Sequence, residues 1–128
     1  MMMDIQAFFH AVLVQDAQAL RAFFHEDAWV NWPCTNEHFT LEEYIRANCE
    51  YPGDWDGELE RATVSGTEII MACRVYPRDR SASFHAVSFL QIRDDRIASM
   101  TEYWADDGPA PAWRQEMRIG RPLNEVAE

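Results

Sequence analysis

The stretch SFHAVSFLQIRDDRIASMTEYW, residues 83–104, predicts a β-hairpin. Two runs rich in β-branched and aromatic residues, Ser83 to Ile92 and Arg96 to Trp104, flank the pair Asp94-Asp95, which is typical of a tight turn. A change of one residue in the length of that turn would turn one strand over relative to the other and place His85 and Glu102 on opposite faces. The turn therefore decides which side chains of the two strands share a face.

With a two-residue turn, His85 faces Trp104 and Val87 faces Glu102. Facing residues share one face of a sheet, and diagonal neighbours lie ~7–8 Å apart. We therefore expect His85 and Glu102 to lie within side-chain reach of each other. The same face is expected to carry four apolar side chains, Val87, Phe89, Met100 and Trp104.

A second hairpin is predicted just upstream. Two further strand-like runs, Glu58 to Val64 and Glu68 to Tyr76, flank Ser65-Gly66-Thr67, which has the composition of a turn. The two hairpins together predict a meander of four strands. The tail from Asp106 holds three of the six prolines and is expected to be mostly irregular.

Helices are predicted to precede the meander. Asp4 can cap a first helix, and a break at Gln15-Asp16 precedes a second, short helix whose apolar stripe ends at Phe24. Ala28 to Trp32 has the pattern of a strand, and Thr40 to Glu43 is a capping box that opens a third helix. This order of elements predicts an α+β fold with helices on one face of an antiparallel sheet.

Length, composition and charge narrow the function. The 128 residues, 48% of them hydrophobic, fit a single domain spanning residues 1–128. The net charge of −11 disfavours binding to nucleic acid or to an anionic membrane surface, and no apolar run is long enough to span a membrane.

The residue types present also restrict cofactors and metals. The chain has no lysine, which excludes a lysine Schiff base, and its glycines form neither a dinucleotide loop nor a phosphate loop, so we expect no cofactor. Cys34, Cys49 and Cys73 form no metal-binding spacing, so we expect no metal and reduced thiols. The first residues lack the basic segment of a signal peptide, which predicts a cytoplasmic protein.

Two segments resemble a known family. The sequence Phe24-His25-Glu26-Asp27-Ala28-Trp29-Val30 resembles the entry into the first strand of SnoaL-like, nuclear transport factor 2-like proteins, and Met100 to Trp104 is similar to their last strand. The resemblance implies a cone-shaped, strongly curved antiparallel sheet, packed by about three N-terminal helices and enclosing a pocket, and a homodimer formed through the sheet. Tyr51 to Gly57 and Glu102 to Gly108 are similar to an uncharacterised bacterial subgroup.

The chain departs from the ketosteroid isomerases of that family at one position. Those enzymes place a catalytic aspartate before the proline that corresponds to Pro33, and this chain has Trp32 there. An indole cannot abstract a proton from carbon, so we expect no ketosteroid isomerase activity. Asp106 could match the aspartate that follows the last strand in SnoaL-type cyclases.

His85 and Glu102 are the candidate catalytic pair. On an apolar wall the carboxylate would raise the pKa of the histidine, and either group could move a proton on a ligand. The alternative is structural, because the two could simply hydrogen-bond each other or the Trp104 indole. The candidate ligand-binding residues are Trp32, Asn36, Tyr51, Trp55, Val87, Phe89, Met100, Trp104 and Asp106.

Two functions remain open at this point. The first is a small-molecule-binding protein that acts as a cofactor-free lyase, isomerase or hydrolase on a small apolar or cyclic substrate, with His85 and Glu102 as acid and base. The alternative is a non-catalytic ligand-binding or dimerisation domain.

Overall fold

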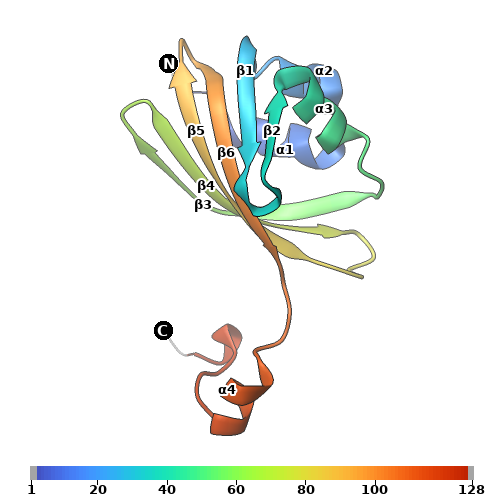
Figure 1. Ribbon diagram of the computed structural model, residues 1–128, viewed down its shortest axis with the longest axis vertical. Coiled ribbons are helices and arrows are strands. Elements are labelled where there is room, and N and C mark those ends of the chain that lie inside the picture. The colour runs from blue at the N-terminus through green and yellow to red at the C-terminus, as the bar shows by residue number, and fades with distance from the viewer. Residues whose placement is uncertain (1–2, 127–128) are drawn as a thin grey trace.

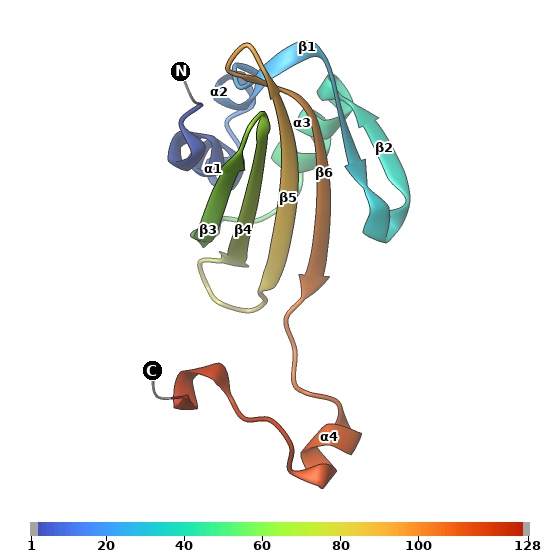
Figure 2. The ribbon, with the colours of Figure 1, turned by 90° about the vertical axis from the view of Figure 1, so that its left-hand side faces the viewer.

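The computed structural model describes residues 3–126, which form an α+β fold around one sheet of six strands (Figures 1 and 2). The strands lie in the order β2-β1-β6-β5-β4-β3, and three helices, α1 to α3, cover one face of the curved sheet. The elements are α1 (Ile5–Val14), α2 (Ala17–Arg21), β1 (Phe24–Trp32), η1 (Pro33–Thr35), β2 (Glu37–Thr40), α3 (Leu41–Cys49), β3 (Trp55–Ser65), β4 (Glu68–Pro77), β5 (Phe84–Arg93), β6 (Arg96–Asp106), α4 (Ala112–Met117) and η2 (Leu123–Glu125).

The predicted helix starts are confirmed by their capping contacts. The Asp4 carboxylate accepts a hydrogen bond from the Ala7 amide at 3.0 Å, and Asp16 accepts one from Ala19 at 3.1 Å. Thr40 and Glu43 form the reciprocal capping box of α3. These contacts satisfy amides that a helix end otherwise leaves unpaired.

The predicted end of the second helix is wrong. Helix α2 stops at Arg21, and Phe24 already belongs to β1, where its ring is buried against Phe8 and Tyr44. Both a helix and a strand can bury a phenylalanine at this position, so the apolar spacing alone did not separate them.

The sheet is mixed, not antiparallel as expected. Strand β1 pairs with β6 in parallel, with Val30 beside Met100, and the other neighbouring strands pair antiparallel. The last strand of the meander, β6, lies beside β1 and runs in the same direction as β1, so the two strands pair in parallel. The edge strand β2 was not predicted, because its four residues are mostly polar and exposed.

The core lies between the helices and the inner face of the sheet. Val30, Ile69, Leu90 and Met100 come from four different strands and are fully buried there. Alternate residues of β4 and β5 point to this side, as a half-buried sheet requires. The helices contribute further apolar side chains to the same cluster, among them Phe8, Phe9, Leu20 and Ile45.

The register of the last hairpin differs from the prediction by one residue. The turn at Asp94-Asp95 has two residues with positive φ, as expected for a tight hairpin turn, and Arg93 pairs with Arg96. The register then shifts between Gln91 and Ile92, because Ala98 is an extra residue in β6. Beyond this bulge His85 pairs with Ala105, and Ser88 pairs with Glu102. The predicted sharing of one face by His85 and Glu102 is therefore wrong.

The chain after β6 leaves the sheet as an extended tail with two short helical turns (Figures 1 and 2). The expectation of a mostly irregular tail is met, except for α4 and η2. Among residues 3–126, no helix is both long and apolar enough to cross a membrane.

A close approach at Gly57 gives a test of the packing. A Cβ at this position would lie 2.4 Å from the Arg74 carbonyl oxygen and within 3.3 Å of the Phe9 and Leu13 side chains. We expect Gly57→Ala to lower the free energy of unfolding by about 1–3 kcal/mol, since β3 must move away from β4 and α1. Urea unfolding followed by tryptophan fluorescence measures this change.

Gly108→Ala is the matched control, because a Cβ there meets no atom within 4 Å. Equal stability of the two variants would show that β3 accommodates the methyl group and that this packing does not constrain the sheet.

Candidate functional site

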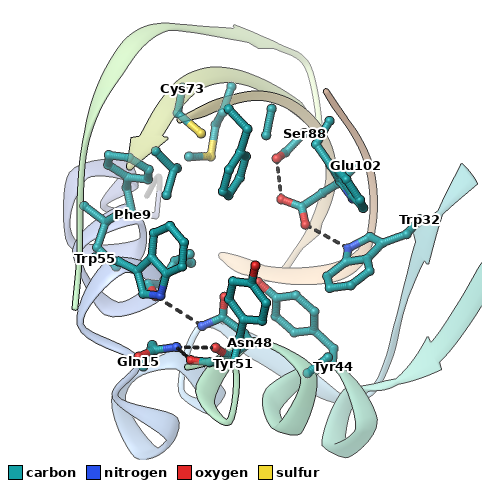
Figure 3. Close-up of a pocket in the computed structure, with 18 of the residues that line it drawn as sticks. Phe9, Gln15, Trp32, Tyr44, Asn48, Tyr51, Trp55, Cys73, Ser88 and Glu102 are labelled. Atoms are coloured by element: carbon teal, nitrogen blue, oxygen red, sulfur yellow. Dashed lines mark hydrogen bonds between the residues drawn. The ribbon is translucent and has the colours of Figure 1, made fainter. Parts of the chain in front are cut away.

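A cavity of about 280 Å³ lies between the helices and the inner face of the sheet (Figure 3). Helices α1 and α3, the segment after α3, and strands β1 and β3 to β6 all contribute to its wall. Its lining residues are Phe8, Phe9, Val12, Leu13, Gln15, Trp32, Tyr44, Ala47, Asn48, Tyr51, Trp55, Met71, Cys73, Val75, Phe84, Ala86, Ser88, Glu102, Trp104 and Asp106.

The wall is mostly apolar and aromatic. Eight of the lining residues carry aromatic rings, and Trp32 packs edge-on against both Tyr44 and Trp104. Two lining residues, Glu102 and Asp106, carry carboxylates, and none is an arginine or a histidine. An anionic ligand would therefore meet only repulsion from ionised groups in this wall.

Glu102 is the acidic group inside the cavity, and two donors hold it. Its Oε1 accepts a hydrogen bond from the Trp32 indole Nε1 at 3.0 Å, and its Oε2 accepts one from the Ser88 hydroxyl at 2.6 Å (Figure 3). Burial raises the pKa of Glu102, and the hydrogen bonds from Ser88 and Trp32 lower it by a smaller amount. The carboxyl group is thus fixed in position and holds its proton to a higher pH than an exposed glutamate.

The amide side chains near the cavity have structural partners. Gln15 Nε2 donates to the carbonyl oxygens of Asn48 and Tyr51, at 2.8 and 2.6 Å. Asn48 Nδ2 donates to the Val12 carbonyl oxygen at 3.1 Å. These bonds tie α1 to the end of α3 and to the segment that carries Tyr51.

Tyr44 and Cys73 do not supply an ionised nucleophile near neutral pH. Burial raises the pKa of the Tyr44 hydroxyl well above its ordinary value, and the nearby Glu102 carboxylate adds to this effect. Burial likewise raises the pKa of the Cys73 thiol to about 12. A thiol in that state is a weak nucleophile.

His85 lies on the opposite, outer face of the sheet. Its Nδ1 hydrogen-bonds the Asp107 carboxylate at 2.5 Å, and its Nε2 lies 3.4 Å from Glu60. The hydrogen bond to Asp107 raises the pKa of His85, and the charges of Asp107 and Glu60 add to it. The bulge at Ala98 is the physical reason for this placement, and it removes His85 from any pairing with Glu102.

Five of the candidate ligand-binding residues line the cavity together with Glu102. They are Trp32, Tyr51, Trp55, Trp104 and Asp106. Whether any of them contacts a ligand stays a prediction.

The other four candidates lie elsewhere. Asn36 ends η1 in a left-handed conformation and is exposed, and Met100 is fully buried in the core. Val87 and Phe89 point outward, because the register shift moved them with His85.

Sequence reasoning missed Ser88 as a partner of Glu102. The sequence held a signal for it, because Ser88 lies two residues from Ala86 and from Leu90 and therefore shares their face of β5. In the shifted register this face points to the interior. Gln15, Tyr44 and Asn48 were missed as cavity residues because they come from helices whose position over the sheet is a tertiary feature.

No group of three or more His, Cys, Asp or Glu residues within 3–126 is arranged to hold a metal ion. The buried polar part of the site consists of Glu102 and its two donors, Trp32 and Ser88, among the surrounding rings.

The raised pKa of Glu102 predicts a pH-dependent difference in stability. A carboxyl group whose pKa is raised on folding stabilises the protein below its ordinary pKa, and this contribution is lost as the pH rises through the raised value. Glutamine cannot ionise. We expect the melting temperature of Glu102→Gln, relative to wild type, to increase as the pH rises above the ordinary pKa of a glutamate and to become constant above the raised pKa of Glu102.

Glu42→Gln is the control of opposite sign, because the hydrogen bond from Arg21 lowers the pKa of Glu42. That variant is expected to lose stability relative to wild type as the pH rises. A Glu102→Gln difference that does not change with pH would mean that Glu102 titrates as an exposed acid.

Solved structures share this architecture. A candidate ketosteroid isomerase of Kribbella flavida DSM 17836 is 22% identical and covers 96% of this chain and 90% of its own, with a TM-score of 0.77. An NTF-2 like protein of unknown function from Burkholderia xenovorans LB400 is 20% identical and covers 93% and 91%, with a TM-score of 0.75. An LEH-like epoxide hydrolase of M. tuberculosis is 13% identical and covers 79% of each chain, with a TM-score of 0.65. Identities this low show the fold alone.

No curated protein matches the chain in sequence. The model of one family does, and it is described as a SnoaL-like domain. The match spans residues 5–100, which are 96 of the 128 residues and include Phe24 to Val30 but only the first residue of Met100 to Trp104. Together with the fold, this match confirms the resemblance, and the chain belongs to the SnoaL-like domain family.

Proposed function

We propose that this SnoaL-like protein binds a small, largely apolar molecule in the cavity and that Glu102 exchanges a proton with it without a cofactor. The reaction would be that of a lyase, isomerase or hydrolase. The observation that carries the proposal is the carboxyl group of Glu102, held by Trp32 and Ser88, on a mostly apolar and aromatic wall.

The hydrogen bonding of Glu102 leaves room for a ligand. Each carboxylate oxygen has two lone pairs, and Trp32 and Ser88 each engage one oxygen, so each oxygen retains one acceptor position. A pKa raised above that of an exposed glutamate suits a group that must both accept and return a proton. In this proposal Glu102 alone serves as both acid and base, whereas the sequence predicted these roles for His85 and Glu102 together.

The size and charge of the cavity define the ligand class. A volume of about 280 Å³ is close to the lower end of the range for small-molecule sites, about 300–1,000 Å³. The wall contains acids and rings but no basic side chain, so we expect a neutral or cationic ligand. A solved neighbour with a ketosteroid isomerase-like fold, from Catenulispora acidiphila DSM 44928, is in complex with trimethylamine, which is a small amine.

The steroid reaction is disfavoured. The residue before Pro33 is Trp32, and its indole N–H is a donor to Glu102 rather than a base. Other solved neighbours, a candidate SnoaL-like polyketide cyclase of Shewanella denitrificans OS-217 and the LEH-like epoxide hydrolase, act on other substrates according to their names. These names support cyclic molecules and epoxides as first compounds to try.

The test is a binding and turnover screen with matched compounds. One ring scaffold is tested as a neutral lactone or epoxide, as an amine and as a carboxylate. We expect the neutral and amine forms to raise the melting temperature and the carboxylate to have no effect. NMR of the same mixtures measures turnover.

Comparing Glu102→Gln with His85→Gln tests whether turnover depends on the acid in the cavity, because His85 is a polar residue outside it. We expect Glu102→Gln to bind the neutral compound and to lose at least about a hundredfold in turnover, in line with the loss of a general acid or base. His85→Gln should behave as wild type, since His85 lies on the outer face. Full turnover by Glu102→Gln would refute the catalytic role.

The second candidate is a non-catalytic ligand-binding or dimerisation domain. If the wild-type protein binds a compound without turning it over, that result would favour a non-catalytic ligand-binding domain. The outer face of the sheet supports a dimerisation domain, because it carries an apolar patch. In this patch Val87 pairs with Tyr103, both side chains are exposed, and the Phe89 ring packs edge-on against Tyr103.

Tyr103→Glu tests that face. If two copies associate through it, a charge in the patch should weaken the dimer by about tenfold or more, measured by sedimentation velocity. Unchanged association would exclude this face as the interface.

A further inference from the structure

The segment that follows β6 is fully exposed. Every described residue from 105 to 126 is exposed, and the backbone bond from Asp107 N to Ser83 O, at 3.0 Å, joins the start of the segment to the sheet. Beyond it, the backbone hydrogen bonds among the described residues of the segment are local, as in α4 and η2. Figures 1 and 2 both show residues 108–126, called the arm below, extending away from the rest of the chain.

The arm carries large apolar side chains on its surface. Trp113, Met117 and Leu123 are 55%, 61% and 92% exposed, and Ile119 and Val126 are also exposed. Trp113 and Met117 are four residues apart in α4 and so lie on one face of it. A helix of six residues is far shorter than the roughly 12–15 residues that an isolated helix needs to be stable in water, so α4 requires a packing partner.

The charge of the chain is divided unequally between the arm and the rest. Residues 1–107 hold 19 acidic and 8 basic residues, which accounts for the whole net charge of −11, whereas residues 108–128 hold three of each. Two acidic bodies repel each other, but the arm, with two acidic and three basic residues, can approach a second body without that cost. Its basic residues, Arg114, Arg118 and Arg121, can in addition pair with acids of that body.

The solved neighbours fall into two groups, according to whether they must cover part of the arm. The chain up to Asp106 is 106 of 128 residues, so the structures that cover 96% and 93% of it must extend into the arm. Those two have the TM-scores of 0.77 and 0.75, whereas the neighbours that cover 77–79% have scores of 0.61–0.65. An extended C-terminal segment is thus part of the architecture that this chain shares with its first two neighbours.

We propose that the arm binds a second copy of this chain, with Trp113, Met117 and Leu123 packing on the body of the partner. A two-fold arrangement would make the exchange reciprocal, so that each copy gives one arm and receives one. The inference concerns assembly and does not depend on the reaction proposed for the cavity.

The test is the association of the full chain with and without the apolar contacts of the arm. Trp113→Ser combined with Leu123→Ser is expected to raise the dimer dissociation constant by roughly tenfold or more, measured by sedimentation velocity over a concentration series. Far-UV circular dichroism should stay close to that of wild type, since no described residue of the arm is buried in the core. Val64→Ser, an exposed apolar residue near the β3–β4 turn, is the matched control and should leave association unchanged.

Hydrogen exchange provides a second measurement on unaltered protein. Amides of residues 112–126 should be protected at high protein concentration and lose that protection on dilution. Exchange of these amides that is fast at every concentration would overturn the proposal. A monomeric wild type, or a double variant that associates as tightly as wild type, would overturn it as well.

Discussion

One extra residue in β6 sets the orientation of every side chain in the second half of the last hairpin. Ala98 forms a bulge close to the turn, and beyond it the pairing of β5 with β6 is shifted by one residue. Because side chains alternate along a strand, this shift determines that Ser88 and Glu102 face the cavity while His85 and Val87 face outward. The acidic site inside and the apolar patch outside both depend on this irregularity.

The cavity holds a carboxyl group at a cost in free energy. Moving an acid from water to a wall of rings disfavours its ionised form, and the donors Trp32 and Ser88 offset only part of that penalty, as the raised pKa of Glu102 indicates. An apolar side chain of similar size would close this part of the core without such a penalty. This penalty supports the proposal that the acid acts on a ligand, for which the adjoining cavity would provide the space.

The features that could be predicted from the sequence are those that local chemistry decides. Asp4, Asp16 and the Thr40–Glu43 box mark helix starts because each cap is satisfied within four residues. The turn at Asp94-Asp95 follows from the same kind of local rule. The bulge at Ala98 does not, because no glycine or proline marks it in Ile97-Ala98-Ser99, and a single missed residue was enough to place His85 on the wrong face. The parallel pairing of β1 with β6 likewise joins segments about 70 residues apart, which no local pattern encodes.

The cavity and the arm are connected through β6. This strand carries Glu102 inside the cavity and Asp106 in its wall, and the chain then continues directly into the arm. Asp107, the residue at the junction, is held by Ser83 and His85 on the neighbouring strand segment, so the end of β6 is fixed on its inner side by the cavity wall and on its outer side by these bonds. If the arm packs on a second copy, it would also limit the motion of the end of β6, because the arm begins at Gly108, directly after the junction. Assembly would then stabilise the wall around Trp104 and Asp106, and the fixed position of β6 would in turn orient the arm towards its partner.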